Sequence, residues 1–253
     1  MNNYNPYSLI GKTILVVGAS SGIGQATAIE SSRLGASVIA VGRNEERLQQ
    51  TLSSMYSSEE TNHQYIIADL LHDEGIENIV SNVSNIDGLM LSAGKGLTLP
   101  IQFATREKFD EMFNINFFSQ VELLRLLFKK KRLNKGASVV LMSSLGGTQV
   151  FSGGNGVYGA SKAALNSIMK FCAKEFAPRK IRVNSICPGM VDTPLIHRGT
   201  VSEEQLQEDM KRYPLKRYGT PKDVAHLAAF LLGDASSWIT GQDFIIDGGI
   251  SIK

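Results

Sequence analysis

The chain has 253 residues, of which 43% are hydrophobic and 20% charged, and its formal net charge at pH 7 is +2. This length suits one large α/β domain that buries roughly 70–75% of its unfolded surface. The small net charge indicates no nucleic-acid partner, and no apolar run approaches the ~18 residues of a membrane helix. The first seven residues lack the apolar core of a signal peptide, so we expect a cytoplasmic protein without a membrane partner.

A short apolar run near the start of the chain leads into a glycine-rich turn. Residues 13–17 read Thr-Ile-Leu-Val-Val, which is typical of a strand buried on both faces of a parallel sheet. The turn has G-x-x-x-G-x-G spacing and is followed by a helical pattern. Glycines here let backbone N–H groups approach a pyrophosphate at the helix N-terminus, although a purely structural turn is the alternative. The residues predicted to bind a dinucleotide are Gly18, Ser20, Ser21, Gly22, Ile23 and Gly24.

A second buried strand, residues 37–42, ends where an NAD-binding protein would carry an acidic residue for the ribose 2′-hydroxyl. Here Gly42 is followed by Arg43. A guanidinium can hold a 2′-phosphate through two hydrogen bonds. The sequence therefore predicts that NADP(H) is preferred over NAD(H). The alternative is that Arg43 is a solvated charge beside the helix N-cap residue Asn44.

Strand-like and helix-like segments alternate along the rest of the chain. This alternation predicts a doubly wound, mostly parallel sheet with helices on both faces and ligands at the carboxyl ends of the strands. The segment 194–214 breaks the pattern with a short polar helix-like stretch, 202–211. No linker divides residues 1–253, so we expect a single domain. The remaining strands are expected at 64–68, 87–91, 138–143, 181–186 and 243–247, and the helices at 45–56, 73–83, 105–133, 156–177 and 221–232.

The strongest indication of function is the stretch Tyr158-Gly-Ala-Ser-Lys162. A tyrosine and a lysine four positions apart share one helix face. An ammonium within a few ångströms favours the phenolate and lowers the tyrosine pKa from its usual value near ~10. Ser144, fourteen positions before Tyr158, can hold the oxygen that exchanges a proton with the phenol. Together these residues suit proton transfer to a carbonyl, whereas an isolated Tyr-x-x-x-Lys match can be two solvated surface residues.

With these motifs in place, the chain resembles the short-chain dehydrogenase/reductase family in its single-domain form, and especially its 3-oxoacyl-[acyl-carrier-protein] reductases. The resemblance implies a Rossmann-type, doubly wound parallel sheet of seven strands and an NAD(P)-dependent reaction at a CH–OH group. It also implies a substrate lid at about 194–214, and a homotetramer (or homodimer) built on the helices 105–133 and 156–177. The resemblance runs from Leu9 to Gly249 and includes Asp69-Leu70, Asn114-Ile-Asn116, Pro188-Gly189 with Thr193, and Ile239–Gly249.

The resemblance also implies a role for each site residue. Tyr158 would be the general acid, and Lys162 would bind the nicotinamide ribose and lower the pKa of Tyr158. Ser144 would polarise the carbonyl, and Asn116 would help to anchor a water that relays protons from Lys162 to solvent. The separation of Ser144 from Tyr158 is one position longer than is usual in the family. Ser143, the preceding serine, is the alternative. The further cofactor contacts that it implies are Asp69 at the adenine, Leu70, Ala93, Gly94, Pro188, Gly189 and Thr193.

Two departures from the family pattern occur together. Val17 stands where the family usually has threonine, and Leu91-Ser92 stand where it usually has two asparagines. Replacing both partners of a buried hydrogen bond can be nearly neutral, whereas losing one partner is costly. We therefore expect apolar packing between Val17 and Leu91 in place of a polar contact.

The histidines and the basic residues give weaker indications of function. The histidines lack the spacing of metal ligands, so no metal is expected. The basic run 129–135 is expected to close a helix, where cations favour the negative end of the dipole. A second interpretation is that Arg132 and Arg179 dock an acidic carrier protein. The four histidines are His63, His72, His197 and His226.

Three functions remain open from the sequence. The leading one is an NADPH-dependent reductase of a 3-oxoacyl thioester or a similar carbonyl. The second keeps this chemistry but acts on a sugar, a sugar nucleotide or another secondary alcohol, because one sequence does not reveal the substrate pocket. The third is a non-enzymatic dinucleotide-binding sensor. The presence of Ser144, Tyr158, Lys162 and Asn116 argues against it, because a binder has no need of a proton relay.

Overall fold

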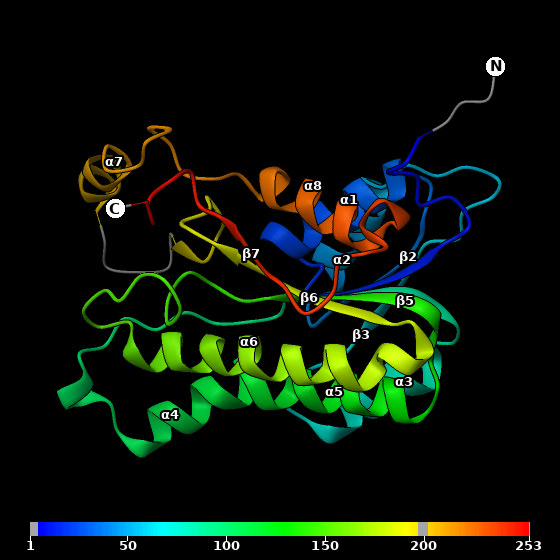
Figure 1. Ribbon diagram of the computed structural model, residues 1–253, viewed down its shortest axis with the longest axis horizontal. Helices are drawn as coiled ribbons and strands as arrows, with labels where there is room; N and C mark the ends of the chain where they lie inside the picture. The colour runs from blue at the N-terminus through cyan, green and yellow to red at the C-terminus, as the bar shows by residue number, and fades with distance from the viewer. Residues whose placement is uncertain (1–4, 197–201, 253) are drawn as a thin grey trace.

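A parallel sheet of seven strands forms the centre of the protein in the computed structural model, which describes residues 5–196 and 202–252 (Figure 1). The strand order is β3-β2-β1-β4-β5-β6-β7, and each neighbouring pair is parallel. The predicted fold class and number of strands are confirmed. The strands are β1 (Thr13–Val17), β2 (Ser37–Gly42), β3 (Gln64–Ile67), β4 (Ile86–Leu91), β5 (Leu133–Met142), β6 (Arg182–Pro188) and β7 (Asp243–Ile246).

Helices cover both faces of the sheet (Figure 1). One layer holds α1, α2 and α8, and the other holds α3, α5 and α6 with α4 at its end. The short helix α7 packs through Leu206 against Tyr213 and Tyr218, away from the two main cores. The helices are α1 (Gly22–Arg33), α2 (Glu45–Ser53), α3 (Asp73–Asn82), α4 (Arg106–Phe113), α5 (Ser119–Lys129), α6 (Gly156–Phe176), α7 (Glu203–Met210) and α8 (Pro221–Leu232).

Alternation along β1 explains why its apolar run is continuous. Leu15 and Val17 join the core on the α5–α6 side, whereas Ile14 and Val16 join the core on the α1–α8 side. Successive side chains of a strand point to opposite faces, and helices exclude water from both. A strand at the centre of a sheet of this kind therefore has no solvent-facing position.

The strand order places a switch point between β1 and β4. From β1 the chain moves outward through β2 and β3, and then returns to the other side of β1 as β4. The turns that follow β1 and β4 therefore leave in opposite directions, which opens a crevice at the carboxyl ends of these strands. The backbone N–H of Ser92 donates to the Val17 carbonyl at 2.9 Å, so the two turns begin side by side.

The expected helix 105–133 is wrong in two respects. It is interrupted by a π-helical turn, Asn114–Phe118, which separates α4 from α5. It also ends at Lys129, because Lys131 adopts a left-handed conformation (φ 55°) and the chain enters β5 at Leu133. Leu133 is fully buried, so the apolar pattern continues across this reversal without indicating it. Lys129 therefore closes the helix as expected, whereas the rest of the basic run 129–135 spans a turn and the start of β5.

The remaining predicted elements agree with the structure within three residues at either end, apart from the start of β5. That strand begins five residues earlier than expected, because Leu133 already pairs with Ile86 before an irregularity in the ladder. The lid helix expected at 202–211 is α7, with Ser202 as its N-cap in a capping box with Gln205. The part of the expected lid at 197–201 lies outside the described residues.

The two departures from the family pattern meet in the sheet. Val17 and Leu91 are register partners on β1 and β4. Both are at most 1% exposed and belong to the same core. The expected apolar contact is confirmed.

Replacing Val17 by threonine should destabilise the protein, because the new hydroxyl would enter an apolar core beside Leu91. Val17→Thr should lower the free energy of unfolding by about 1–3 kcal/mol, as measured by urea unfolding. The double variant with Leu91→Asn offers the hydroxyl a partner and should recover part of this loss. If Val17→Thr were as stable as the wild type, the assignment of an apolar contact would be wrong.

Candidate functional site

Backbone contacts at the carboxyl ends of β1 and β4 require glycine in the first turn. Gly18 has a positive φ of 85°, and a Cβ atom there would lie 2.8 Å from the Ala93 nitrogen. A Cβ atom on Gly24 would lie 2.2 Å from the Gly18 carbonyl oxygen. Neither approach is possible for a residue with a side chain. The glycine spacing is therefore imposed by the meeting of β1, α1 and the turn after β4.

The N-terminus of α1 is open toward this crevice. Its N-cap residue, Ser21, makes no side-chain capping bond, and the first turn contains no acidic residue. Gly22 begins the helix with a φ of 57°, and its missing Cβ would lie 3.3 Å from Thr193 Cγ2. Ile23 packs against the α1–α8 core. Unpaired N–H groups and the helix dipole favour an anion at such an end, so a dinucleotide pyrophosphate fits here.

The residues expected at the adenine end also come together. Ser20 lies against Gly42, where an added Cβ would be 3.2 Å from the serine Oγ. Arg43 Nη1 forms an ion pair with Asp69 Oδ2 at 3.4 Å, and the Arg43 side chain is 68% exposed. Asp69 also accepts a hydrogen bond from the Leu71 backbone, while Leu70 is buried. The guanidinium is thus held by a weak surface pair from which it can reach a ligand.

Ser144 lies beside Tyr158, whereas Ser143 does not serve that position. The Ser143 hydroxyl is buried and donates to the Lys162 carbonyl at 3.0 Å. The Ser144 hydroxyl accepts from the Gly146 backbone at 3.1 Å and hydrogen-bonds to the Tyr158 phenol. The contacts therefore favour Ser144, the residue chosen from the sequence, although the loop to Tyr158 is one position longer than usual in the family.

Lys162 is a buried cation at the centre of the site. Its side chain is on α6, is 4% exposed, and donates from Nζ to the Met142 carbonyl at 2.8 Å. Burial lowers its pKa to about 8, because an ammonium is poorly solvated in this interior. A Cβ atom on Gly94 would lie 3.3 Å from Nζ, so the turn after β4 passes directly over the ammonium.

The pKa of Tyr158 is raised, which corrects the expected shift. The largest cause is burial of the phenol among protein atoms, and the Ser144 hydrogen bond only partly opposes it. The Lys162 ammonium donates to the Met142 carbonyl and lies 6.0 Å from the Tyr158 ring centre. The phenol therefore keeps its proton at neutral pH in this structure.

Asn116 fastens the turn after β4 to the π-helical turn. Its side-chain oxygen accepts from the Lys95 backbone at 2.9 Å, and its amide donates to the Lys95 carbonyl at 3.0 Å. The same amide donates to Ser161 on α6 at 3.1 Å. A Cβ atom on Gly94 would lie 3.1 Å from Asn116 Oδ1. Gly94 thus lies between Asn116 and Lys162, the two residues expected to share a proton relay.

The segment after β6 also borders the site. Pro188 is buried and its carbonyl accepts from Leu145, which joins this border to the loop of Ser144. Gly189 lies against Asp247, from which an added Cβ would be 3.1 Å away. Farther along, Leu195 contacts Gly96, with an added Cβ 3.7 Å from its Cδ1. The start of the expected lid therefore reaches the turn after β4.

One polar residue at the site was not anticipated. Gln120 on α5 is fully buried and donates to the Ala93 carbonyl at 2.8 Å. A glutamine among the apolar positions of a helix is a signal that the sequence does contain, since such residues are rarely buried without partners.

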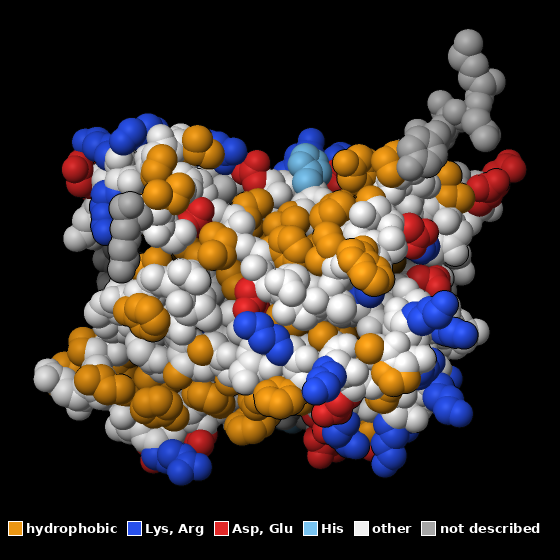
Figure 2. Space-filling model, viewed as in Figure 1, with side chains coloured by type: hydrophobic (Ala, Val, Ile, Leu, Met, Phe, Trp, Pro, Cys, Tyr) orange, Lys and Arg blue, Asp and Glu red, His pale blue; other side chains and the backbone are white. Residues whose placement is uncertain are grey.

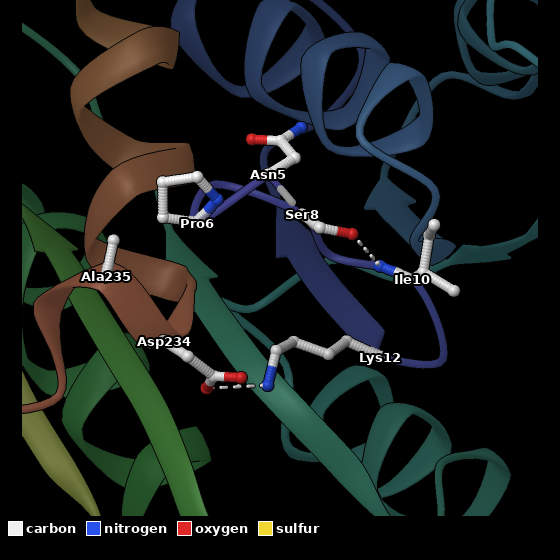
Figure 3. A pocket seen from close by; sticks show the side chains of 7 residues that line it. All are labelled: Asn5, Pro6, Ser8, Ile10, Lys12, Asp234 and Ala235. Atoms are coloured by element: carbon white, nitrogen blue, oxygen red, sulfur yellow. Dashed lines mark hydrogen bonds and ion pairs between the residues drawn. The ribbon is translucent and has the colours of Figure 1, made fainter. Parts of the chain in front are cut away.

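Two cavities show how the site differs from the opposite edge of the sheet. The larger, of about 390 Å³, lies at the amino end of β1, where Lys12 pairs with Asp234 at 2.9 Å (Figure 3). It is remote from the carboxyl ends of the strands and holds none of the residues described above. The smaller cavity, of about 230 Å³, includes Met190, Val191 and Asp247, and lies beside the segment that follows β6. The site is therefore identified by the residues that meet there, and not by the volume of a cavity.

The structure also bears on the remaining sequence expectations. Among residues 5–196 and 202–252, no group of three or more His, Cys, Asp or Glu side chains could hold a metal ion, and His197 lies outside these ranges. Within the same ranges, no helix is long and apolar enough to cross a membrane. Arg179 donates to the Leu133 carbonyl and lies 5.5 Å from the Phe128 ring centre, so its guanidinium contributes to the fold.

Known proteins resemble this chain over nearly its whole length. A family model described as enoyl-(acyl carrier protein) reductase matches residues 18–251. The 3-oxoacyl-[acyl-carrier-protein] reductase FabG of Rickettsia conorii is 37% identical over 245 residues, or 96% of this chain and 98% of that protein. A tropinone reductase homolog of Arabidopsis thaliana is 34% identical, over 98% of this chain and 92% of that one.

A solved structure extends the likeness to the fold and to a bound dinucleotide. The Beutenbergia cavernae protein assigned as an NAD(P)-dependent gluconate 5-dehydrogenase superposes with a TM-score of 0.87 and 28% sequence identity. The match covers 98% of this chain and all of that one, and that structure contains NADP at low occupancy.

The buried ammonium predicts an unusual pH dependence of stability. In the folded protein Lys162 loses its proton near pH 8, whereas the unfolded chain holds it to about pH 10.5. Between these values the unfolded state binds more protons, so this group makes the free energy of unfolding rise with pH. Relative to Lys162→Met, the wild type should gain roughly 2–3 kcal/mol between pH 7 and pH 10.

Urea unfolding of the ligand-free proteins across this pH range measures the difference. Lys174→Met, at an exposed position of the same helix, controls for the loss of one positive charge. A difference between wild type and Lys162→Met that stays constant with pH would contradict the lowered pKa.

Proposed function

The chain belongs to the short-chain dehydrogenase/reductase family, and we propose that within it the protein is an NADPH-dependent reductase of a 3-oxoacyl thioester or similar ketone. Members of this family are NAD(P)-dependent oxidoreductases that act on carbonyl/alcohol pairs. The observation that carries the proposal is the meeting of Ser144 and Tyr158 beside the buried Lys162, at the edge of the sheet where the glycine turn offers a dinucleotide site.

The two hydroxyl groups act on the carbonyl oxygen in different ways. A bound nicotinamide would supply the hydride that reduces the carbonyl carbon. Ser144 donates a hydrogen bond to the oxygen, and Tyr158 transfers its proton to it as negative charge develops. The raised pKa of Tyr158 supports this direction, because the phenol is protonated before reaction begins.

Lys162 and Asn116 are proposed to restore that proton. The Lys162 ammonium, held by the Met142 carbonyl, is placed to bind the ribose hydroxyls of the cofactor. Its pKa of about 8 suits exchange of a proton near neutral pH. Asn116 is separated from the ammonium by Gly94 alone, which supports its part in a relay to solvent.

The preference for NADPH rests on Arg43. Its exposed guanidinium follows the end of β2 and pairs with the adenine-side Asp69, while Ser20 lies against the neighbouring Gly42. A 2′-phosphate there would meet a cation that forms two hydrogen bonds, whereas a 2′-hydroxyl would gain less. The bound NADP of the Beutenbergia protein is in accord with this preference.

Two other functions remain as alternatives. A sugar, sugar nucleotide or other secondary alcohol could replace the 3-oxoacyl thioester without any change in the roles of Ser144 and Tyr158. The assignments of the tropinone reductase homolog and of the gluconate dehydrogenase show how widely the substrates of similar proteins vary. A non-enzymatic sensor is less favoured, because the paired hydroxyl groups of Ser144 and Tyr158 have no purpose in simple dinucleotide binding.

We also propose a homotetramer, with a homodimer as the alternative, and a lid at about 194–214. Hydrophobic side chains gather on the part of the surface where α4 and α6 lie in Figure 1 (Figure 2). The exposed aromatic side chains of this part of the chain include Phe118 in the π-helical turn, which is 54% exposed, and Phe171 on α6, which is 61% exposed. Docking of a carrier protein at Arg132 and Arg179, and the cytoplasmic location, stay predictions.

The reductase chemistry is tested by NADPH oxidation at 340 nm with an acetoacetyl thioester. Removing the proton donor in Tyr158→Phe should lower kcat by about 10²- to 10⁴-fold. NADPH binding, followed by fluorescence, should persist in this variant. Activity close to that of the wild type would exclude Tyr158 as the acid. A wild type that binds NADPH but reduces no ketone or sugar substrate would favour the sensor.

The cofactor preference is tested by Arg43→Ala. Loss of the guanidinium removes a charge-assisted contact to the 2′-phosphate and leaves the Asp69 carboxylate to repel it. The KM for NADPH should rise by about 10-fold, while that for NADH should change by less than about 2-fold. Arg33→Ala, at the far end of α1, is the matched loss of a surface arginine. Equal effects on both cofactors would contradict the assignment.

A further inference from the structure

A buried amide connects the cofactor side of the site with the π-helical turn. Gln120 lies in the first turns of α5 and has no exposed surface. Its side-chain Nε2 donates to the Ala93 carbonyl at 2.8 Å and to the Asn116 carbonyl at 2.9 Å, with a longer contact to Ile115 at 3.4 Å. All three partners are acceptors, so only the NH₂ end of the amide can face them.

The π-helical turn explains why this donor is needed. Ser119 donates its backbone N–H to Asn114, five residues earlier, so the helix is wider here than an α-helix. Such a turn disturbs the regular pairing of carbonyl groups, and buried carbonyl groups require donors. The Gln120 side chain supplies one to Asn116 while it also reaches across to Ala93.

Ala93 is thereby held from two sides. Its backbone nitrogen lies against Gly18, where an added Cβ would be only 2.8 Å away. Its carbonyl oxygen is bound by Gln120. The next residue, Gly94, lies between Asn116 Oδ1 and Lys162 Nζ. A small movement of this turn would therefore change both the glycine turn and the surroundings of the ammonium.

We propose that Gln120 is a positioning residue that fixes the turn 92–94 against the glycine turn, and so sets the affinity for the dinucleotide. This inference rests on the proposed use of both turns as the dinucleotide site. Gln120 acts through Ala93 and Asn116 and does not itself react. Its Oε1 has no hydrogen-bond partner among the described residues, so the side chain acts through its donated bonds alone.

The test compares two buried amides of matched burial. Gln120→Met keeps the side-chain length and removes both donors. Asn184→Leu is the control, because Asn184 is equally buried in β6 but binds Ile239 and Gln242, away from both turns. Each variant should lower the melting temperature of the ligand-free protein by a few degrees, since each leaves backbone groups unpaired.

The affinity for the dinucleotide should differ between the Gln120→Met and Asn184→Leu variants. Gln120→Met should raise the Kd for NADPH by about 10-fold, equivalent to about 1.4 kcal/mol, by isothermal titration calorimetry. Asn184→Leu should leave it within about 2-fold. Gln120→Asn keeps a shorter amide that can reach one carbonyl, so its Kd should fall between wild type and methionine. This variant also keeps the test valid if the methionine variant fails to fold.

The outcomes distinguish this inference from the proposed function. An unchanged Kd in Gln120→Met, or equal weakening in Asn184→Leu, would overturn the positioning role even if the reductase is active. The reverse can also occur, because a wild type that binds NADPH but reduces no ketone would contradict the proposed function while the graded Kd series still supports the role of Gln120.

Discussion

The structure depends on the close approach of the turns that follow two adjacent parallel strands. Gly18 and Ala93 touch through their backbones because β1 and β4 are hydrogen-bonded neighbours that end at the same level. No side chain fits between the two turns, so Gly18 is required by geometry as well as by any ligand. The open N-terminus of α1 and the passage of Gly94 over Lys162 both follow from this contact.

A second constraint is that polar side chains are buried beside an apolar sheet. An ammonium and two amides lie where water is largely excluded, a half-buried phenol lies beside them, and each finds a protein partner. The backbone supplies most of these partners, as carbonyl groups released at strand ends and at the π-helical turn. Burial then sets the proton affinities, lowering the pKa of Lys162 and raising that of Tyr158.

The two ends of the site differ in rigidity for the same reason. At the adenine end, Arg43 and Asp69 form an exposed pair that costs little to rearrange. At the catalytic end, Asn116 and Gln120 join α5, α6 and the turn after β4 through buried hydrogen bonds, which are costly to break. On the proposed assignment, cofactor preference depends on a surface residue, while the interior holds the residues proposed to carry the reaction.

The strand and helix order, the glycine turn and the Tyr158–Lys162 pair could all be predicted from the sequence. These are local patterns whose period or spacing follows directly from backbone geometry. The π-helical turn within the helix expected at 105–133, and the end of that helix at Lys129, became visible in the folded chain, because a buried Leu133 continues the apolar period across the reversal. The fold also sets the direction of the Tyr158 pKa shift and the partners of Gln120. Burial and contacts between distant segments exist only once the sheet has brought those segments together.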